Sequence, residues 1–451
     1  MYMVFRYRDL YRLIVIIQWV ILILTGSFQV MAEIDFTGIS LSRDTGYSAP
    51  VIQEEQHELT LHDAVRLMLQ NNPELASFSK EVRAFDGTVL QASKFRNPDF
   101  TVEVEDINQP RPSLQRFTSF RISQLIELGG KRSARMTVAS LGQELADKSY
   151  ESRRLDLIAR AANAFIDVLA GQERLRVAEE TLQLTQKVLD SATKRVESGK
   201  APPIEETRSK VALSTAHIEL EQARRDLTAA RTQLSLLWGN PSPKFSKVMG
   251  DLETRVVLPG FAELEERIKY NPLVLRSLTN VEQRKAIIEL EKSRRIPDVT
   301  LGGGVRRYFQ SDDTTALLTM TVPIPVFDRN QGNLQEGYQR LDKAMDEKDM
   351  IHLQLRSEFT RAYEALLAAQ NEVRLLHEEV LPGAETAFKV ANKGYELGRF
   401  SFLEMLDAQR ALFQNRVLYV RAQANYHRLI NELERLVAAP IDSVMPDHES
   451  R

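Results

Sequence analysis

The sequence predicts a mainly α-helical chain with a small β part, arranged as two similar halves. Three observations support this: paired landmarks recur at a fixed offset, two very long segments have helical periodicity, and four short segments alternate apolar and polar residues. The chain of 451 residues has no cysteine and a net charge of −3. The absence of cysteine excludes disulfides, thiolate nucleophiles and cysteine-bound metals. The balanced charge argues against a nucleic-acid binder, which would need a basic surface.

The first 32 residues are predicted to be a secretory signal peptide (1–32), followed by an N-terminal extension (33–58). Arginines within residues 6–12 precede an apolar run from Leu13 to Leu24, and Val30-Met31-Ala32 resembles a cleavage site. An N-terminal membrane anchor is the alternative, although the run is shorter than the about 18–20 residues that a spanning helix needs. Since no other segment approaches that length, an exported chain would have to enter a membrane with β-strands.

Internal repetition divides the rest of the chain. Four landmarks recur 199 residues apart: Asn72-Pro73 with Asn271-Pro272, Pro98-Asp99 with Pro297-Asp298, Gly199 with Gly398, and Glu205 with Glu404. The stretch 164–172 resembles 362–370 one residue out of step. We therefore predict a first repeat at 59–240 and a second at 262–439, joined by a linker (241–261) and followed by a tail (440–451).

Each repeat is predicted to follow one plan. A helical segment, 61–95 or 262–295, is broken once at the Asn-Pro. A β-hairpin follows, at 100–125 with strands 100–105 and 117–125, or at 299–322 with strands 299–309 and 316–322. A very long helix comes next, 133–195 or 330–393, with Pro382 as the internal breaker of the second. A return helix, 204–237 or 402–437, completes each repeat.

Length arithmetic indicates two parallel helical columns in each repeat. The helix 133–195 would be about 95 Å long at 1.5 Å per residue, and the two shorter helices stacked end to end would reach about 104 Å. One column would be continuous and the other would have two pieces of similar total height. A long antiparallel coiled coil is the alternative, because helical periodicity alone does not separate the two arrangements.

Four strands leave two open sheet edges, and unpaired backbone groups in lipid cost several kcal/mol each. Three chains that contribute four strands each would close a 12-stranded barrel, with twelve helical columns continuing as a tube. The predicted fold class is therefore a long α-helical barrel plus a four-strand contribution per chain to a trimeric 12-stranded transmembrane β-barrel. The alternative is two chains that close an eight-stranded barrel, but the interior of such a barrel would be filled by side chains.

Three motifs carry a resemblance to a known family: QLIELGGKR at 124–132, PIPVFDRNQG at 323–332, and GYELGR at 394–399 running into LEMLDAQR at 403–410. From residue 59 to 437 the chain resembles the TolC family of outer-membrane efflux factors, most closely the branch that serves cobalt–zinc–cadmium exporters. The resemblance implies a homotrimeric tunnel with a barrel in the outer-membrane lipid and a helical barrel in the periplasm. It also implies docking to a periplasmic membrane-fusion adaptor and a proton-driven inner-membrane pump of the resistance-nodulation-division type.

The two helical turns at 195–205 and 393–404 lie at the end opposite the strands, which in the family fold is the periplasmic entrance. Gly199 and Gly398 permit the chain to reverse with positive φ, and they are the candidate adaptor-docking tips. Ordinary helix stops are the alternative interpretation. Glu404 and Asp407 are three residues apart and share a helical face, so three chains could place two carboxylate rings at the narrowest point. A solvated helix face is the alternative for these two acids.

The resemblance adds further candidates for the periplasmic gate. Glu205 and Tyr395 match family positions where neighbouring helices make gate contacts, and Arg195 and Arg399 are nearby cations that could bridge to them. The family often has a basic residue at the position of Phe400, so a salt-bridge latch is not expected there.

No catalytic pattern is found in the sequence. The seven histidines form no i, i+4 pair or HExxH motif, and Gly302-Gly303-Gly304 lies in a predicted strand rather than before a helix. We therefore expect no enzyme activity, no cofactor and no resident metal. The resemblance implies a passive exit duct, and its branch implies heavy-metal cations as the cargo. Two alternatives remain open: a duct for drug or protein and peptide secretion, and a periplasmic coiled-coil scaffold without a pore.

Overall fold

The computed structural model describes residues 58–105, 116–254 and 256–441. The chain divides into two units, Met1–Val51 and Ile52–Arg451, and the described residues all belong to the second. The predicted signal peptide, nearly all of the N-terminal extension, most of the segment between the first two predicted strands and most of the tail lie outside the described residues.

The first repeat contains the predicted helices and strands. Its elements are α2 (Leu61–Asn71), α3 (Pro73–Ser93), β2 (Asp99–Glu105), β3 (Phe117–Ile126), α4 (Lys131–Glu197) and α5 (Pro203–Leu236). A short parallel pair, β1 (Glu58–Leu59) with β4 (Lys247–Val248), ties the linker to the beginning of the repeat. The two strands predicted in this repeat agree with the observed strands to within one residue at each end, because alternation of side chains marks their bounds directly.

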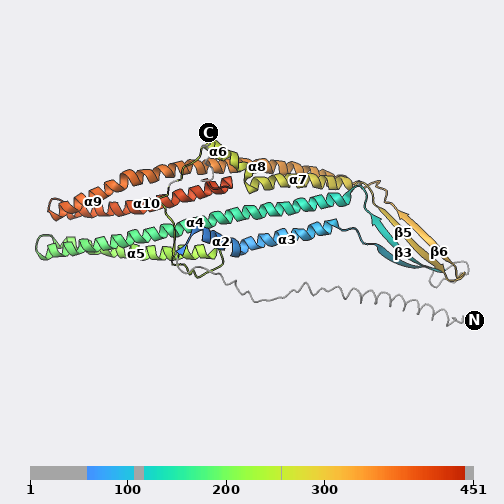
Figure 1. The fold of residues 1–451 in the computed structure, drawn as a ribbon, viewed down its shortest axis with the longest axis horizontal. Helices are drawn as coiled ribbons and strands as arrows, with labels where there is room; N and C mark the ends of the chain where they lie inside the picture. The colour runs from blue at the N-terminus through green and yellow to red at the C-terminus, as the bar shows by residue number, and fades with distance from the viewer. Residues whose placement is uncertain (1–57, 106–115, 255, 442–451) are drawn as a thin grey trace, which may run out of the picture. The chain divides into compact units, whose positions relative to one another are not determined.

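The second repeat follows the same order with one added irregularity. Its elements are α6 (Phe261–Glu265), the 3-10 turn η2 (Glu266–Tyr270), α7 (Pro272–Ser293), β5 (Val299–Tyr308), β6 (Thr314–Thr321), α8 (Gln331–Leu375), the π turn η3 (Leu376–Val380), α9 (Leu381–Glu396) and α10 (Phe402–Val437). Figure 1 shows the long helices of both repeats side by side, with the strands at one end of this unit.

The repeated Asn-Pro has the same structural role in both copies. The Asn72 side chain accepts from the amide of Leu75 at the start of α3 and donates to the carbonyl of Leu237 at 2.7 Å. Asn271 likewise caps α7 and donates to the carbonyl of Leu436 at 3.0 Å. The proline that follows each asparagine suits the first helical turn because it needs no amide partner there. Each asparagine therefore starts one helix and holds the end of the return helix.

The π turn shows how the second long helix accommodates Pro382, the predicted internal breaker. The amide of Leu381 donates to the carbonyl of Leu376, five residues earlier. In a regular α-helix the ring of Pro382 would clash with the carbonyl four residues back, and the wider turn removes that clash. The predicted breaker therefore does not end the helix, which continues through Pro382 to Glu396.

The helices form four adjacent columns. Figure 1 shows α4 with α3 and α5 on one side and α7 and α10 on the other, while α8 and α9 lie beyond α7 and α10. A large apolar core joins α6, α8 and α10 around the fully buried Phe359 and Leu433, and a second surrounds Trp238 and Phe245 near the linker. These cores fix the middle of the helical part, where the linker crosses it.

The four long strands form one antiparallel sheet in the order β2-β3-β5-β6. The central pair joins the two repeats, with Phe117 opposite Tyr308 and Ile126 opposite Val299. Strands β2 and β6 are the two edges of this sheet within the chain. Among the described residues, no helix is both long enough and apolar enough to cross a lipid bilayer.

Candidate functional site

The two faces of the sheet differ in chemistry. The register places these mostly apolar side chains on one face: Phe100, Val102, Val104, Phe120, Ile122, Val305, Leu318 and Met320. The opposite face carries Thr101, Glu103, Ser119, Arg121, Ser123, Thr300, Arg306 and Thr319. Leu318 is 92% exposed and Met320 is 70% exposed, so no part of the chain that the structure describes covers these apolar side chains. This alternation is typical of a barrel wall with lipid outside and water inside.

Side chains on the polar face contact one another. The Ser119 hydroxyl and the Arg121 guanidinium both donate to the Glu103 carboxylate, at 3.1 and 3.3 Å. The Arg306 guanidinium lies 3.9 Å from the centre of the Phe117 ring. This face therefore carries both acidic and basic side chains, and a pore lined by it would be polar.

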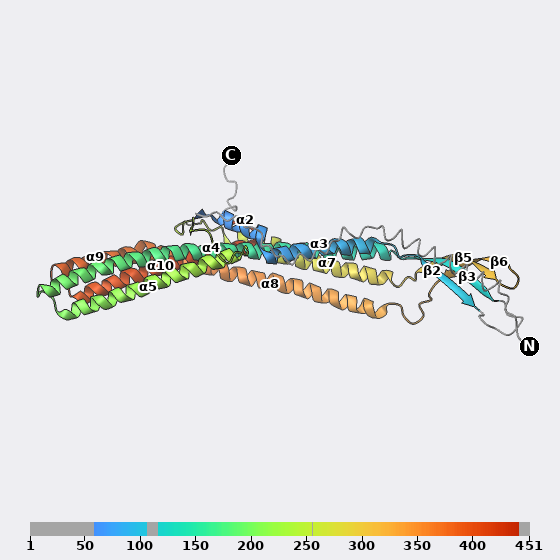
Figure 2. The same cartoon turned by 90° about the horizontal axis from the view of Figure 1, so that it is seen from below.

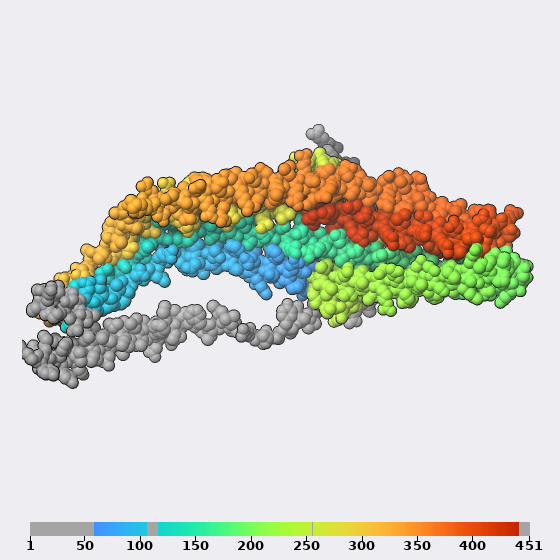
Figure 3. Space-filling model, turned by 180° about the vertical axis from the view of Figure 1, so that it is seen from behind, coloured from blue at the N-terminus to red at the C-terminus, as the bar shows by residue number. Residues whose placement is uncertain are grey.

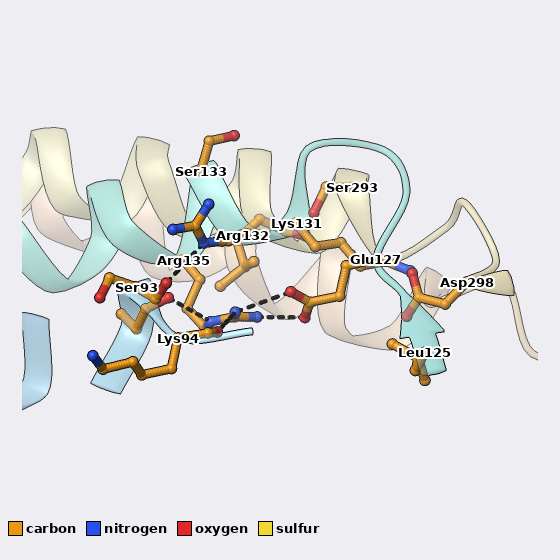
Figure 4. Close-up of polar contacts among 12 residues, drawn as sticks. Ser93, Lys94, Leu125, Glu127, Lys131, Arg132, Ser133, Arg135, Ser293 and Asp298 are labelled. Carbon is orange, nitrogen blue, oxygen red and sulfur yellow. Dashed lines mark hydrogen bonds and ion pairs between the residues drawn. The ribbon is translucent and has the colours of Figure 1, made fainter. Parts of the chain in front are cut away.

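A collar of polar contacts joins the strands to the helices, formed by the QLIELGGKR motif and its neighbours (Figure 4). The Lys131 ammonium donates to the Asp298 carboxylate and to the Ile296 carbonyl, both at 2.5 Å. Lys131 is only 8% exposed. The amide of Leu128 also donates to Asp298 at 3.0 Å. The first repeat's strand-to-helix turn is therefore fastened to the start of β5.

The same motif caps the end of α3. Arg135 donates to both oxygens of Glu127, at 2.7 and 3.1 Å, and to the Ala92 carbonyl. Arg132 donates to the Ser93 carbonyl at 2.8 Å, as Figure 4 shows. These arginines satisfy carbonyl groups at a helix C-terminus, which would otherwise lack donors. The arginines of this motif therefore act in the junction between helix and strand.

At the opposite end of the helices, the two turns lie close together, as the green and red tips of Figure 3 show. Gly199 has φ of 69° and Gly398 has φ of 71°. A side chain would be strained at either position although a Cβ would meet nothing within 4 Å at Gly199 or Gly398. The two tips are thus open, tight reversals.

Tyr395 links both repeats at this end. Its hydroxyl donates to the Glu205 carboxylate at 2.7 Å, and Arg195 donates to its carbonyl at 3.0 Å. The guanidinium of Arg195 also lies 4.5 Å from the centre of the Tyr395 ring. Burial, followed by the hydrogen bond to Glu205, raises the pKa of Tyr395 to about 12. The structure therefore brings three of the predicted residues together as one buried contact.

Glu404 has a structural role that was not predicted from the sequence. Its carboxylate accepts from the Ser401 amide at 2.7 Å and from the Ser401 hydroxyl at 2.9 Å, and the Glu404 amide donates to that hydroxyl. This is a capping box at the start of α10, and the spacing Ser401-x-x-Glu404 in the sequence could have identified it. The Ser401 amide, and then its hydroxyl, lower the pKa of Glu404.

The remaining predicted tip residues are exposed. Asp407 lies one turn beyond Glu404, opposite the buried Met405 and Leu406. The side chain of Arg399 makes no hydrogen bond or ion pair within the described residues. Phe400 packs against Gly394, where a Cβ would lie 2.0 Å from the Phe400 ring. Glu404 and Asp407 are therefore not bridged to Arg399 within one chain.

A polar seam between the repeats was not predicted. The buried Gln409 of α10 donates to the Thr185 hydroxyl of α4 at 2.9 Å. About two helical turns further along α10, Arg416 donates to Glu180 at 2.9 Å and to Glu385 at 3.0 Å. These contacts fix the register of α4 against α10 and so the height of one tip against the other. In the part of the chain that the structure describes, no group of three or more histidine or carboxylate side chains could hold a metal ion.

Comparison with known proteins identifies the family. A model of the outer membrane efflux protein family matches residues 64–240 and again residues 264–439. The chain belongs to the outer membrane efflux protein family. It is 34% identical over 396 residues to the cobalt-zinc-cadmium resistance protein CzcC of Cupriavidus metallidurans, a match that covers 87% of this chain and 94% of that protein. It is 22% identical to the cation efflux system protein CusC of Escherichia coli, covering 88% and 83% of the two chains.

Solved structures of the outer membrane efflux protein family have the same fold. A crystal structure of CusC aligns with a TM-score of 0.74 at 16% identity, covering 86% of this chain and 93% of that one. The outer membrane protein VceC of Vibrio cholerae aligns with a TM-score of 0.70 at 17% identity, covering 84% and 96%. The predicted fold class is confirmed: the chain is an outer-membrane channel subunit, mainly helical with a small sheet, and channels of this family are trimers with a helical barrel in the periplasm. Channels of this family export in concert with an adaptor and an inner-membrane pump.

Proposed function

We propose that this chain forms the passive exit duct for heavy-metal cations, working with a membrane-fusion adaptor and a proton-driven resistance-nodulation-division pump. The similarity to CzcC, at 34% identity over nearly the whole of both chains, carries this proposal. The role is non-enzymatic, since the pore has only to offer a polar path. The polar face of the sheet, which carries both acidic and basic side chains, suits the passage of hydrated ions.

The proposed gate is the buried contact of Tyr395 with Glu205 and Arg195 at the periplasmic tips. It holds the two helical turns of one chain together, so an opening movement that separates the repeats has to break it. Gly199 and Gly398 present the two turns outward as the docking tips for the adaptor. Glu404 and Asp407 lie beside them, and three copies would supply the carboxylate ring that attracts cations.

The cargo is tested by deleting the gene and measuring growth on zinc, cobalt and cadmium salts. We expect increased sensitivity to at least one of these metals, restored by the intact gene, with unchanged sensitivity to an exported drug. Sensitivity to the drug alone would replace the metal cargo with the drug-efflux alternative. Fractionation of the protein away from the outer membrane would support the scaffold alternative instead.

Replacing Tyr395 with phenylalanine is expected to open the channel more often. The variant removes the hydrogen bond to the charged Glu205, which is worth about 1.5 kcal/mol and so about tenfold in the open population. The measurement is single-channel conductance in planar bilayers, with Tyr270→Phe, an exposed tyrosine, as the control.

Because the pKa of Tyr395 is raised to about 12, the contact is complete below about pH 10 and is lost only as the pH rises toward 12. Conductance of the native channel should therefore not change between about pH 7 and about pH 9.

Removing the two charges of the proposed ring is expected to reduce cation selectivity. Glu404→Gln with Asp407→Asn keeps the capping box, because glutamine can replace glutamate in it. The ratio of cation to anion permeability, from reversal potentials in a salt gradient, should fall about threefold or more at low ionic strength. The control is Glu396→Gln, an exposed acid paired with Lys393 near the same turn. An unchanged ratio would assign Glu404 to the helix cap alone and Asp407 to a solvated face.

A further inference from the structure

At the collar, the two repeats are joined by one ion pair within the chain. The equivalent ion pair at the second strand-to-helix turn is not made among the described residues. Lys131, at the first strand-to-helix turn, is held by Asp298, which directly precedes β5. The repeat places Asp99 at the position equivalent to Asp298, because Pro98-Asp99 and Pro297-Asp298 are 199 residues apart. The cation equivalent to Lys131 should therefore lie at the second strand-to-helix turn.

The offset identifies that cation as Arg329. Residues 164–172 of α4 match 362–370 of α8 at an offset of 198, and neither helix is interrupted between that stretch and its start. The same offset carries Lys131 to Arg329 and Ile126 to Ile324, although Lys131 is the first residue of α4 and Arg329 lies two residues before the start of α8. Asp99 and Arg329 are both exposed, and within the described residues neither side chain has a hydrogen bond or ion pair. One acidic and one basic residue thus stand unpaired at equivalent places.

The topology of the sheet places these two residues at its opposite edges. Asp99 begins β2, and Arg329 follows β6, so they lie at the same end of the two edge strands. They cannot meet within one chain, because β3 and β5 lie between them. In a closed trimer, β6 of one subunit adjoins β2 of the next. Ile324, 83% exposed, and Phe327, 90% exposed, precede Arg329 and are not covered by other described residues.

We propose that Arg329 of each subunit pairs with Asp99 of the next subunit, so that three such ion pairs alternate with three Lys131–Asp298 pairs around the collar. The observed register of β3 with β5 is consistent with this arrangement. Shifting its pairs Ile122–Gly303 and Gln124–Leu301 by the two offsets places Met320 opposite Val104 and Val322 opposite Val102 of the next subunit. Met320 and Val104 both lie on the apolar face, as a shared lipid-facing surface requires.

The inference extends the trimeric assembly and does not depend on the cargo. It is tested by cross-linking in isolated outer membranes, for which the native chain is a clean background because it has no cysteine. The variant carries Asp99→Cys with Arg329→Cys and is treated with a short bismaleimide. Cross-linked dimers and trimers on a denaturing gel are expected, with monomers alone for each single variant. The matched control, Lys131→Cys with Asp298→Cys, should cross-link only within the monomer.

Monomers alone from the double variant, with the trimer intact on a native gel, would overturn this pairing and leave the proposed duct standing. Absence of any trimer in the native protein would overturn the duct itself. If the cysteine variant does not assemble, charge reversal decides. Asp99→Arg or Arg329→Asp alone should lower the temperature at which the trimer dissociates, and the two together should recover at least half of that loss. No recovery would also overturn the pairing.

Discussion

Gly304→Ala is expected to prevent assembly of the channel. A Cβ at Gly304 would lie 2.1 Å from the Phe120 carbonyl oxygen and 2.9 Å from the Cα of Arg121, both backbone atoms of the neighbouring strand. The strands would have to separate at the central pair that joins the two repeats, which costs at least about 3 kcal/mol. The amount of trimer in the outer membrane, measured by immunoblot of unheated samples, should fall at least about tenfold.

The adjacent Gly303→Ala is the matched control. A Cβ there would meet only the Leu317 carbonyl at 4.0 Å, so there is room for the methyl group. Alanine also restricts the unfolded chain more than glycine does, and the variant should assemble at least as well as the native protein. Equal trimer from both variants would show that β3 and β5 are further apart than the structure has them.

Asp298→Ala is the second substitution with a large expected effect. It leaves the nearly buried ammonium of Lys131 without its carboxylate and removes the acceptor for the Leu128 amide. Removing one partner of such a pair costs about 3 kcal/mol, since the remaining charge stays desolvated. The guanidinium midpoint for dissociation and unfolding of the purified trimer in detergent measures this loss.

The double variant Lys131→Met with Asp298→Ala separates the two causes. It removes both charges, so most of the loss should be recovered if the unpaired ammonium is responsible. Glu266→Ala, which breaks the exposed pair of Glu266 with Lys269, should leave the midpoint unchanged. A loss for Asp298→Ala no larger than for Glu266→Ala would mean that the collar contact contributes little to stability.

The regular elements could be predicted because their signals are local. The helix Phe402–Val437 has the predicted bounds, and each strand was found because its side chains alternate. The recurring Asn-Pro marked both breaks, although only the structure shows that Asn72 and Asn271 also hold the return helices. The π turn was not predicted, because a proline signals a break without specifying how the backbone accommodates it.

The site was harder to predict, because its contacts join residues far apart in the sequence. The link from Tyr395 to Glu205 spans 190 residues, and family resemblance alone suggested it. The contact of Gln409 with Thr185 has no sequence signal, since both residue types are usually exposed. The capping box could have been predicted from the spacing of Ser401 and Glu404, but Glu404 was interpreted, together with Asp407, as a pore charge.

The π turn at Leu376–Val380 also explains why the two repeats can differ in length without losing their match. The offset between the repeats is 198 just before this turn and 199 after it, so the stretch of the second helix that contains the turn holds one more residue than the matching stretch of α4. In an unbroken α-helix one added residue would rotate everything beyond it by about 100° and turn Tyr395 away from Glu205. The π turn accommodates the added residue in its wider coil, so the side chains of the helix beyond the turn keep their orientation. The inserted residue therefore leaves the contact of Tyr395 with Glu205 at the tunnel mouth undisturbed.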